Sequence, residues 1–278
     1  MRPKLLAFDL DGTLMNSKNE LTLRTQEALQ KAHAAGVLIV PATGRLYASM
    51  PAPLLQMPFI RYAITLNGTQ VCDVQADAVI SRAEVPLATA LQVLEYLDQY
   101  PVYYDCYAGS RGWVTQSMRD HATDYIVGAH PLHMVRDFRT PVDELKAFLR
   151  QRGESVQKLQ MYTKDDALRE RVMADLAVRF PTLSISASLS CNIEINDRHA
   201  NKGEALEKLA AHLRLPLADV MALGDGRNDL RLLQTAGLGV AMANAHPDVL
   251  AVADAQTASC DEDGAALAIE RWCLAQEA

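Results

Sequence analysis

An apolar run that ends in two carboxylates constrains the fold of this chain more than any other stretch. Residues 5–8 are all apolar and predict a buried β-strand. Asp9 and Asp11 follow directly, and side chains two positions apart on an extended backbone point the same way. Two carboxylates held that close repel each other unless a cation lies between them or one is protonated. A hard divalent ion, Mg²⁺ above all, meets this requirement because it prefers oxygen ligands.

The Asp-x-Asp-Gly pattern also occurs in surface turns and in calcium-binding loops. A calcium loop is disfavoured because Leu14, Asn16 and Glu20 do not continue the alternating series of oxygen ligands. A plain surface turn stays open on this stretch alone. The rest of the chain therefore has to decide between a turn and a metal site.

Composition excludes several classes of protein. The 278 residues are enough for one large domain or two modest ones, and 49% are hydrophobic. A net charge of -7, from 27 basic and 34 acidic residues, offers no basic excess for nucleic acid. The five cysteines are dispersed, which favours reduced thiols over a disulfide framework or a zinc site. Because no signal peptide or membrane-spanning run is evident, we expect a cytoplasmic protein without a membrane partner.

Strand and helix patterns alternate at both ends of the chain. Short apolar runs are separated there by amphipathic stretches with helical spacing. This alternation is the βαβ pattern of a parallel sheet, whose functional loops lie at the carboxyl ends of the strands. The expected strands are 5–8, 37–40, 62–66, 220–223 and 238–242, and the expected helices include 22–35, 230–236 and 264–274.

Residues 84–195 follow a different pattern. Amphipathic helices at 87–100 and 165–180 are mixed with strand-like runs, which is typical of an α+β domain. We therefore predict an α/β protein with two parts: a Rossmann-like parallel-sheet core formed by 1–83 and 196–278, and an α+β domain inserted at 84–195.

Two finer predictions concern the inserted domain. Thr140 and Pro141 predict the start of a further helix, with threonine as its N-cap and proline in the first helical position. Five tyrosines are expected to belong to the core of this domain: Tyr96, Tyr100, Tyr103, Tyr104 and Tyr107.

Polar residues stand at the ends of the expected core strands and at one helix start. Carboxylates suit Mg²⁺, and lysine, hydroxyl and N–H donors suit a tetrahedral anion, so the set describes a phosphoryl-transfer site. Each residue alone has a simpler explanation as a turn, a helix cap or a solvated side chain. A lysine at a helix start nevertheless opposes the helix dipole. The candidates are Asp9, Asp11, Thr43, Gly44, Lys202, Asp225, Asn228 and Asp229.

The order of these motifs resembles the haloacid dehalogenase (HAD) superfamily. The match rests on Asp9-Leu-Asp11-Gly-Thr, then Thr43-Gly44-Arg45, Lys202-Gly203, and Gly224-Asp225-Gly226-Arg227-Asn228-Asp229. Asn67-Gly68 and Met242-Ala243-Asn244-Ala245 also resemble its Cof-type hydrolases, which carry a large α/β (type IIB) cap. The resemblance covers essentially the whole chain and places the cap in the inserted segment.

The resemblance implies a Mg²⁺-dependent phosphatase of small phosphorylated metabolites. We expect a monomer or a small homo-oligomer, a choice that the sequence leaves open. Asp9 would be the nucleophile that forms an aspartyl-phosphate, and Asp11 the general acid and base. Mg²⁺ would be held by Asp9, the Asp11 carbonyl and Asp225, with Asp229 acting through water or from just outside the ligand set. The phosphate would bind to Thr43, Gly44, Lys202 and Asn228. Sugar phosphates, pyridoxal phosphate and FMN are substrates that the resemblance allows.

Two other functions use similar residues. A phosphomutase of the same superfamily would pass the phosphoryl group to an acceptor other than water. A receiver-like signalling module also groups aspartates, a threonine and a lysine around Mg²⁺, but it is much shorter and has no inserted cap. A dehalogenase is disfavoured because its chemistry needs no metal, which would leave Asp11 and Asp225 unexplained.

Overall fold

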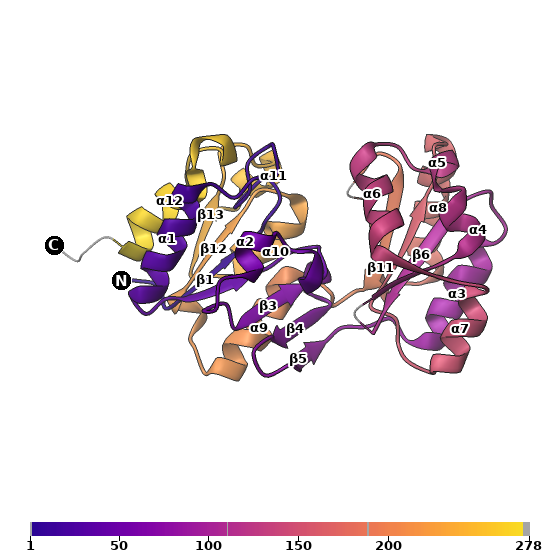
Figure 1. Cartoon of the computed structure of the whole chain (residues 1–278), viewed down its shortest axis with the longest axis horizontal. Coiled ribbons are helices and arrows are strands. Elements are labelled where there is room, and N and C mark those ends of the chain that lie inside the picture. Colours follow the sequence, from indigo (N-terminus) through magenta and orange to yellow (C-terminus); the bar gives the residue numbers. More distant parts are fainter. Residues whose placement is uncertain (1, 110, 188, 275–278) are drawn as a thin grey trace. The chain divides into compact units, whose positions relative to one another are not determined.

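The computed structural model describes residues 2–109, 111–187 and 189–274. The chain divides into two units. The first comprises the residues up to Arg82 and from Asn201 onward, so in Figure 1 it carries both the indigo start and the yellow end of the chain. The second is Ala83–Ala200, and the insertion expected at 84–195 lies inside it. Residues 275–278, the end of the expected core segment, lie outside the described residues.

A parallel sheet forms the centre of the first unit, in the order β14-β13-β12-β1-β2. The strand β1 lies between β12 and β2 and is completely buried, which confirms the prediction from its apolar run. Leu5 of this strand pairs with Val220 on one side and Leu38 on the other. The strands are β1 (Leu5–Phe8), β2 (Leu38–Pro41), β12 (Val220–Gly224), β13 (Leu238–Ala241) and β14 (Ala255–Gln256).

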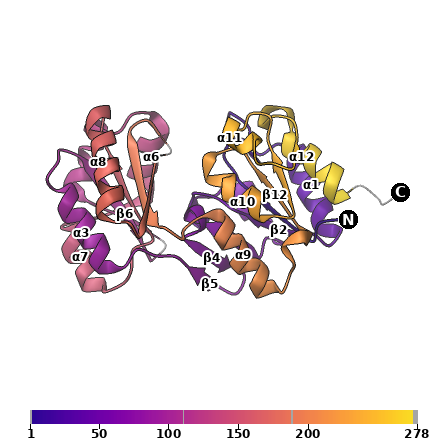
Figure 2. The ribbon, with the colours of Figure 1, turned by 180° about the vertical axis from the view of Figure 1, so that it is seen from behind.

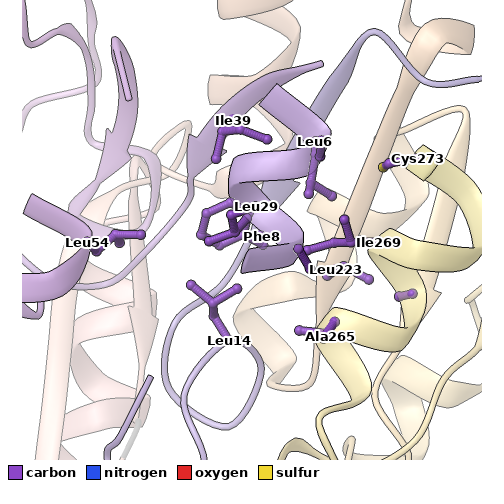
Figure 3. Packing of buried hydrophobic residues seen from close by; sticks show 14 of the residues in the cluster. Leu6, Phe8, Leu14, Leu29, Ile39, Leu54, Leu223, Ala265, Ile269 and Cys273 are labelled. Carbon is purple, nitrogen blue, oxygen red and sulfur yellow. The ribbon is translucent and has the colours of Figure 1, made fainter. Parts of the chain in front are cut away.

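Helices cover both faces of this sheet (Figures 1 and 2). Alternate residues of β1 face opposite ways, so Leu6 and Phe8 pack with the helices of one face and Leu5 and Ala7 with those of the other. The face of Leu6 and Phe8 carries α1 (Leu23–Ala34) and α12 (Gly264–Ala268), which continues as the π-helical segment Ile269–Leu274. Figure 3 shows Phe8 beside Leu29 of α1 on this face. The opposite face carries α9 (Lys202–Leu213) and α10 (Leu230–Thr235).

The strand β3 (Tyr62–Thr65) departs from the expected parallel arrangement. It pairs antiparallel with β4 (Gln70–Asp73), which pairs with β5 (Ala78–Arg82), and an isolated parallel bridge joins Ala42 to Ile64. The chain reverses directly after β3 instead of crossing over through a helix. Between β2 and β3 the chain forms a 3-10 turn, Tyr47–Ser49, and the short helix α2, Ala52–Leu55.

The second unit is built on a six-stranded sheet in the order β10-β11-β9-β6-β7-β8. Its neighbouring strands are antiparallel except for β7 and β8, which are parallel. The strands are β6 (Tyr103–Ala108), β7 (Arg111–Thr115), β8 (Arg139–Val142), β9 (Lys158–Tyr162), β10 (Leu183–Ser186) and β11 (Asn192–Asp197).

Helices of the second unit enclose a core of its own. Apolar residues of α3 (Leu87–Leu97), α7 (Leu145–Arg152) and α8 (Asp166–Arg179) pack with the sheet. Three short helices follow β7: α4 (Gln116–Asp120), α5 (Ala122–Tyr125) and α6 (Ala129–Phe138). The expected burial is confirmed for four of the five tyrosines, Tyr96, Tyr103, Tyr104 and Tyr107, whereas Tyr100 is partly exposed.

The prediction that a helix begins at Thr140 is wrong. Thr140 and Pro141 belong to β8, where Thr140 lies opposite Trp113 of β7. β8 is an edge strand, and an edge position tolerates a proline because one side of the strand needs no N–H donor. The helix α7 begins later, and the side chain of Glu144 caps it by accepting the N–H groups of Lys146 and Ala147.

No helix within the described ranges is long and apolar enough to cross a membrane.

Candidate active site

Asp9 lies where β1 ends at the carboxyl edge of the core sheet. Its backbone N–H donates to the Leu223 carbonyl at 3.0 Å, so the pairing of β1 with β12 extends one residue beyond the strand. Asp225 comes directly after β12. Because the two strands are parallel neighbours, their carboxyl ends deliver both aspartates to one place.

Three buried or partly buried carboxylates gather there. One oxygen each from Asp9, Asp225 and Asp229 lies within 4.8 Å of the others. Asp229 is fully buried, and its Oδ2 accepts the N–H groups of Asp225 at 3.0 Å and Gly226 at 2.9 Å. The Thr13 hydroxyl donates to Asp225 Oδ1 at 2.7 Å. The fold therefore fixes a set of hard oxygen donors, which is the ligand chemistry that Mg²⁺ prefers.

Lys202 is buried against two of these carboxylates. Its Nζ lies 2.7 Å from Asp9 Oδ1 and 2.6 Å from Asp229 Oδ1, and its side chain has no exposed surface. It is the first residue of α9, whose N-cap Asn201 accepts the N–H of Glu204 at 2.9 Å. The alternative interpretation of Lys202 as a solvated side chain, which the sequence alone allowed, is therefore wrong.

Burial and mutual repulsion raise the pKa values of the carboxyl groups. Burial raises the pKa of Asp9 to about 7, and the charge of Asp229 adds to this while Lys202 opposes it. Burial raises the pKa of Asp225 to about 6 against the hydrogen bond from Thr13, and it raises that of Asp229 against Lys202. Burial acts to lower the pKa of Lys202, but the charges of Asp229 and Asp9 outweigh it. One ammonium among three carboxylates leaves negative charge for a further cation to balance.

Asp11 stands apart from this cluster. Its side chain is exposed and forms a bidentate ion pair with Arg45, whose Nε lies 2.9 Å from Oδ2 and whose terminal nitrogen lies 2.5 Å from Oδ1. The metal-binding group found among the described residues does not include Asp11. In the sequence Arg45 was named only as part of the Thr43-Gly44-Arg45 motif, and the structure shows that its ion-pair partner is a candidate catalytic residue.

The remaining candidates border the same edge of the sheet. Thr43 is buried, and its hydroxyl oxygen accepts the Arg45 N–H at 3.1 Å. Asn228 immediately precedes Asp229, and its Nδ2 donates to Asn67 Oδ1 at 3.1 Å. A Cβ added to Gly44 would lie 3.0 Å from that same Asn67 oxygen. The eight candidates therefore belong to one set of neighbouring loops.

Sequence reasoning gave no role to several residues that hold these loops together. The Thr13 hydroxyl orients Asp225, and Asn244 Nδ2 donates to the Gly12 carbonyl at 2.8 Å in the loop after β1. Asn67 was noted only as part of a family pattern. Asn244 and Asn67 both follow expected strands, which is the signal that points to them.

Residues 6–269 match the sequence profile of a family described as haloacid dehalogenase-like hydrolase. The chain belongs to this family. It is an enzyme of the hydrolase class, and the predicted superfamily and α/β fold are confirmed.

Relatives support the same conclusion over nearly the whole chain. The phosphatase YwpJ of Bacillus subtilis is 29% identical over 289 residues, which span 95% of this chain and 97% of that protein. An HMP-PP phosphatase of Cronobacter sakazakii is 32% identical over 252 residues, which span 89% of this chain and 87% of that protein. The solved structure of a HAD subclass IIB sugar phosphatase matches with a TM-score of 0.80 at 24% identity, covering 98% of this chain and all of that one, and shows the same fold.

Proposed function

We propose that this protein is a Mg²⁺-dependent phosphatase that hydrolyses phosphate monoesters of small metabolites. The observation that carries the proposal is the position of Asp9. It lies at the carboxyl end of β1, 2.7 Å from the buried Lys202 and within 4.8 Å of the carboxylates of Asp225 and Asp229. A carboxylate attacks an anionic phosphate only where nearby cations offset the repulsion, and this site brings such groups together.

The donor set of the cluster fits Mg²⁺. Asp9, Asp225 and the backbone carbonyl of Asp11 would hold the ion, and Asp229 would act through a water molecule. When bound, Mg²⁺ supplies charge neutralisation for the phosphate and helps to orient it. The three raised carboxyl pKa values are consistent with this assignment, because they mark negative charge that lacks a full counter-charge.

The chain's own residues would carry out two steps. In the first, an Asp9 oxygen bonds to phosphorus while the bond from phosphorus to the leaving oxygen breaks, and Asp11 gives that oxygen a proton. In the second, Asp11 takes a proton from water, whose oxygen attacks the aspartyl-phosphate and releases inorganic phosphate and free Asp9. The phosphate would be held throughout by Thr43, Gly44, Lys202 and Asn228.

The substrate is proposed to be a small phosphorylated metabolite, such as a sugar phosphate, pyridoxal phosphate or FMN. Curated relatives support the small size, since one of them is named for hydrolysis of HMP-PP. We assign the choice of leaving group to the second unit, acting as the cap of the enzyme, because all eight candidate residues belong to the first unit.

The test is phosphate release from p-nitrophenyl phosphate and from a panel of metabolite esters, with Mg²⁺ and with EDTA. Asp9→Asn is expected to abolish release, because an amide cannot serve as the nucleophile, and to leave the circular dichroism spectrum unchanged. Asp77→Asn is the matched control, because Asp77 is an exposed turn residue with a positive φ that asparagine also tolerates.

Full phosphate release by Asp9→Asn would refute the proposal. Product analysis separates the alternatives: transfer to a second sugar hydroxyl indicates a phosphomutase, and an aspartyl-phosphate that persists for hours indicates a receiver-like module.

A further inference from the structure

Three consecutive residues after β3 adopt the left-handed backbone conformation. Their φ angles are 51° at Leu66, 58° at Asn67 and 95° at Gly68. Glycine adopts this region freely and asparagine tolerates it, but a leucine there is strained. Strained backbone of this kind persists only where the surrounding structure enforces it, and it concentrates at functional sites.

Hydrogen bonds and close packing enforce the conformation of this loop. The N–H of Leu66 donates to the Arg45 carbonyl at 3.1 Å, and that of Asn67 to the Thr43 carbonyl at 3.0 Å. On the other side, a Cβ on Gly68 would overlap the carbonyl of Asn201 and lie 2.9 Å from the backbone nitrogen of Lys202. The loop is therefore fixed between the Thr43–Arg45 segment and the start of α9.

The side chain of Asn67 reaches two further candidates for phosphate binding. Its Oδ1 accepts from Asn228 Nδ2 at 3.1 Å and lies 3.0 Å from the position that a Cβ on Gly44 would occupy. A carboxamide has one accepting oxygen and one donating nitrogen, so this contact selects which end of the Asn228 side chain faces Asn67. Asn228 itself is exposed, and this hydrogen bond limits the rotation of its side chain.

We propose that Asn67 is a positioning residue of the phosphate site and that it acts through Asn228. Holding one N–H of Asn228 Nδ2 fixes the direction of the second N–H, which is the one that can donate to a phosphate oxygen. The proposal rests on the proposed function, because it takes a phosphate monoester as the ligand. A side chain at position 44 would also press against the Asn67 carboxamide, because its Cβ would lie 3.0 Å from Asn67 Oδ1.

The experiment measures the inhibition constant of inorganic phosphate and the KM for p-nitrophenyl phosphate in Asn67→Gly. Glycine keeps the left-handed backbone and removes only the carboxamide. Both constants are expected to rise about tenfold, the typical effect of one lost hydrogen bond. Asn19→Gly is the matched control, because Asn19 also has a positive φ, of 60°, and lies exposed in the polar segment before α1. It should leave both constants unchanged.

A double-mutant cycle with Asn228→Ala distinguishes positioning from direct binding. If Asn67 acts through Asn228, the double variant binds phosphate no more weakly than Asn228→Ala alone. Additive losses, or an unchanged inhibition constant in Asn67→Gly, would overturn the inference. Failure of the proposed function is recognised separately, because the wild-type enzyme would then release no phosphate from any ester.

Discussion

At the scale of single residues, Lys202 is the point on which the charge balance of the site depends. It is the fully buried ammonium that Asp9 and Asp229 share. Removing one partner of a buried ion pair costs about 3–5 kcal/mol, because the other charge is left without compensation. Here two carboxylates would be left, and their response depends on pH.

Lys202→Met is therefore expected to lower the free energy of unfolding by about 3–5 kcal/mol at pH 8 without Mg²⁺. The loss should be smaller at pH 5. A carboxyl group whose pKa is higher in the folded state than in the unfolded state stabilises the folded state at low pH. This stabilisation is lost as the pH rises through the pKa of the folded state. The pKa of Asp9 is already raised to about 7 with the lysine present, so at pH 5 this group can be neutral in the variant.

Urea unfolding at the two pH values measures this effect. Lys4→Met is the matched control, because Lys4 pairs with Asp219 at 2.7 Å but its side chain is 63% exposed. An exposed pair contributes at most about 1 kcal/mol. An equal loss at pH 5 and pH 8 for Lys202→Met would show that the carboxylates are not the cause.

Sequence was sufficient to predict which candidate residues come together at this edge of the sheet but not their side-chain contacts. Strands of a parallel sheet bring their carboxyl ends together, so Asp9 and Asp225 could be placed side by side from their positions after apolar runs. The pairing of Asp11 with Arg45 and of Asn228 with Asn67 depends on rotamers and on a left-handed backbone at Leu66. The presence of a leucine does not predict that conformation, because the surrounding contacts impose it.

At the scale of elements, local signals succeeded where they did not compete with pairing. The helix α1 was expected at 22–35 and is found at Leu23–Ala34, where the Thr22 side chain caps it by accepting the N–H of Thr25. The signal at Thr140 and Pro141 looked equally good, but these residues pair as an edge strand with β7. Strand pairing joins residues far apart in sequence, so a local pattern cannot reveal it.

Gly68 and Gly36 illustrate two different reasons why a position requires glycine: backbone conformation and close packing. Both have a positive φ, 95° and 90°, but a Cβ on Gly36 would meet nothing within 4 Å, whereas one on Gly68 would overlap the Asn201 carbonyl at the start of α9. Gly36→Ala is expected to cost about 1–2 kcal/mol from backbone strain alone. Gly68→Ala should cost more, because α9 must also shift.

Since Lys202 is the first residue of α9, that shift should also weaken phosphate binding. Urea unfolding and the inhibition constant of inorganic phosphate measure the two effects. Gly36→Ala serves as the matched control and should leave phosphate binding unchanged. If Gly68→Ala bound phosphate as the wild type does, the loop would not position the start of α9.

At the scale of the whole molecule, the chain has two units with separate apolar cores. All eight candidate site residues belong to the first unit, including those before Arg82 and those after Asn201. A ligand that binds only the folded state stabilises the unit that holds its site, by RT ln(1 + [L]/Kd). Ligand binding should therefore act unequally on the two cores.

The two tryptophans allow this to be measured, because one lies in each unit. Trp272 packs against the core beside α12, and Trp113 packs in the second unit, where its indole N–H donates to the Ala108 carbonyl at 2.8 Å. In Trp113→Phe, Mg²⁺ with inorganic phosphate at a hundred times the dissociation constant should stabilise the transition seen by Trp272 by about 2.7 kcal/mol. In Trp272→Phe, the transition seen by Trp113 should not move. Equal shifts in both variants would mean that the two cores unfold as one cooperative unit. If the shift persisted in an Asp9→Asn background, ligand binding at this site would not be its cause.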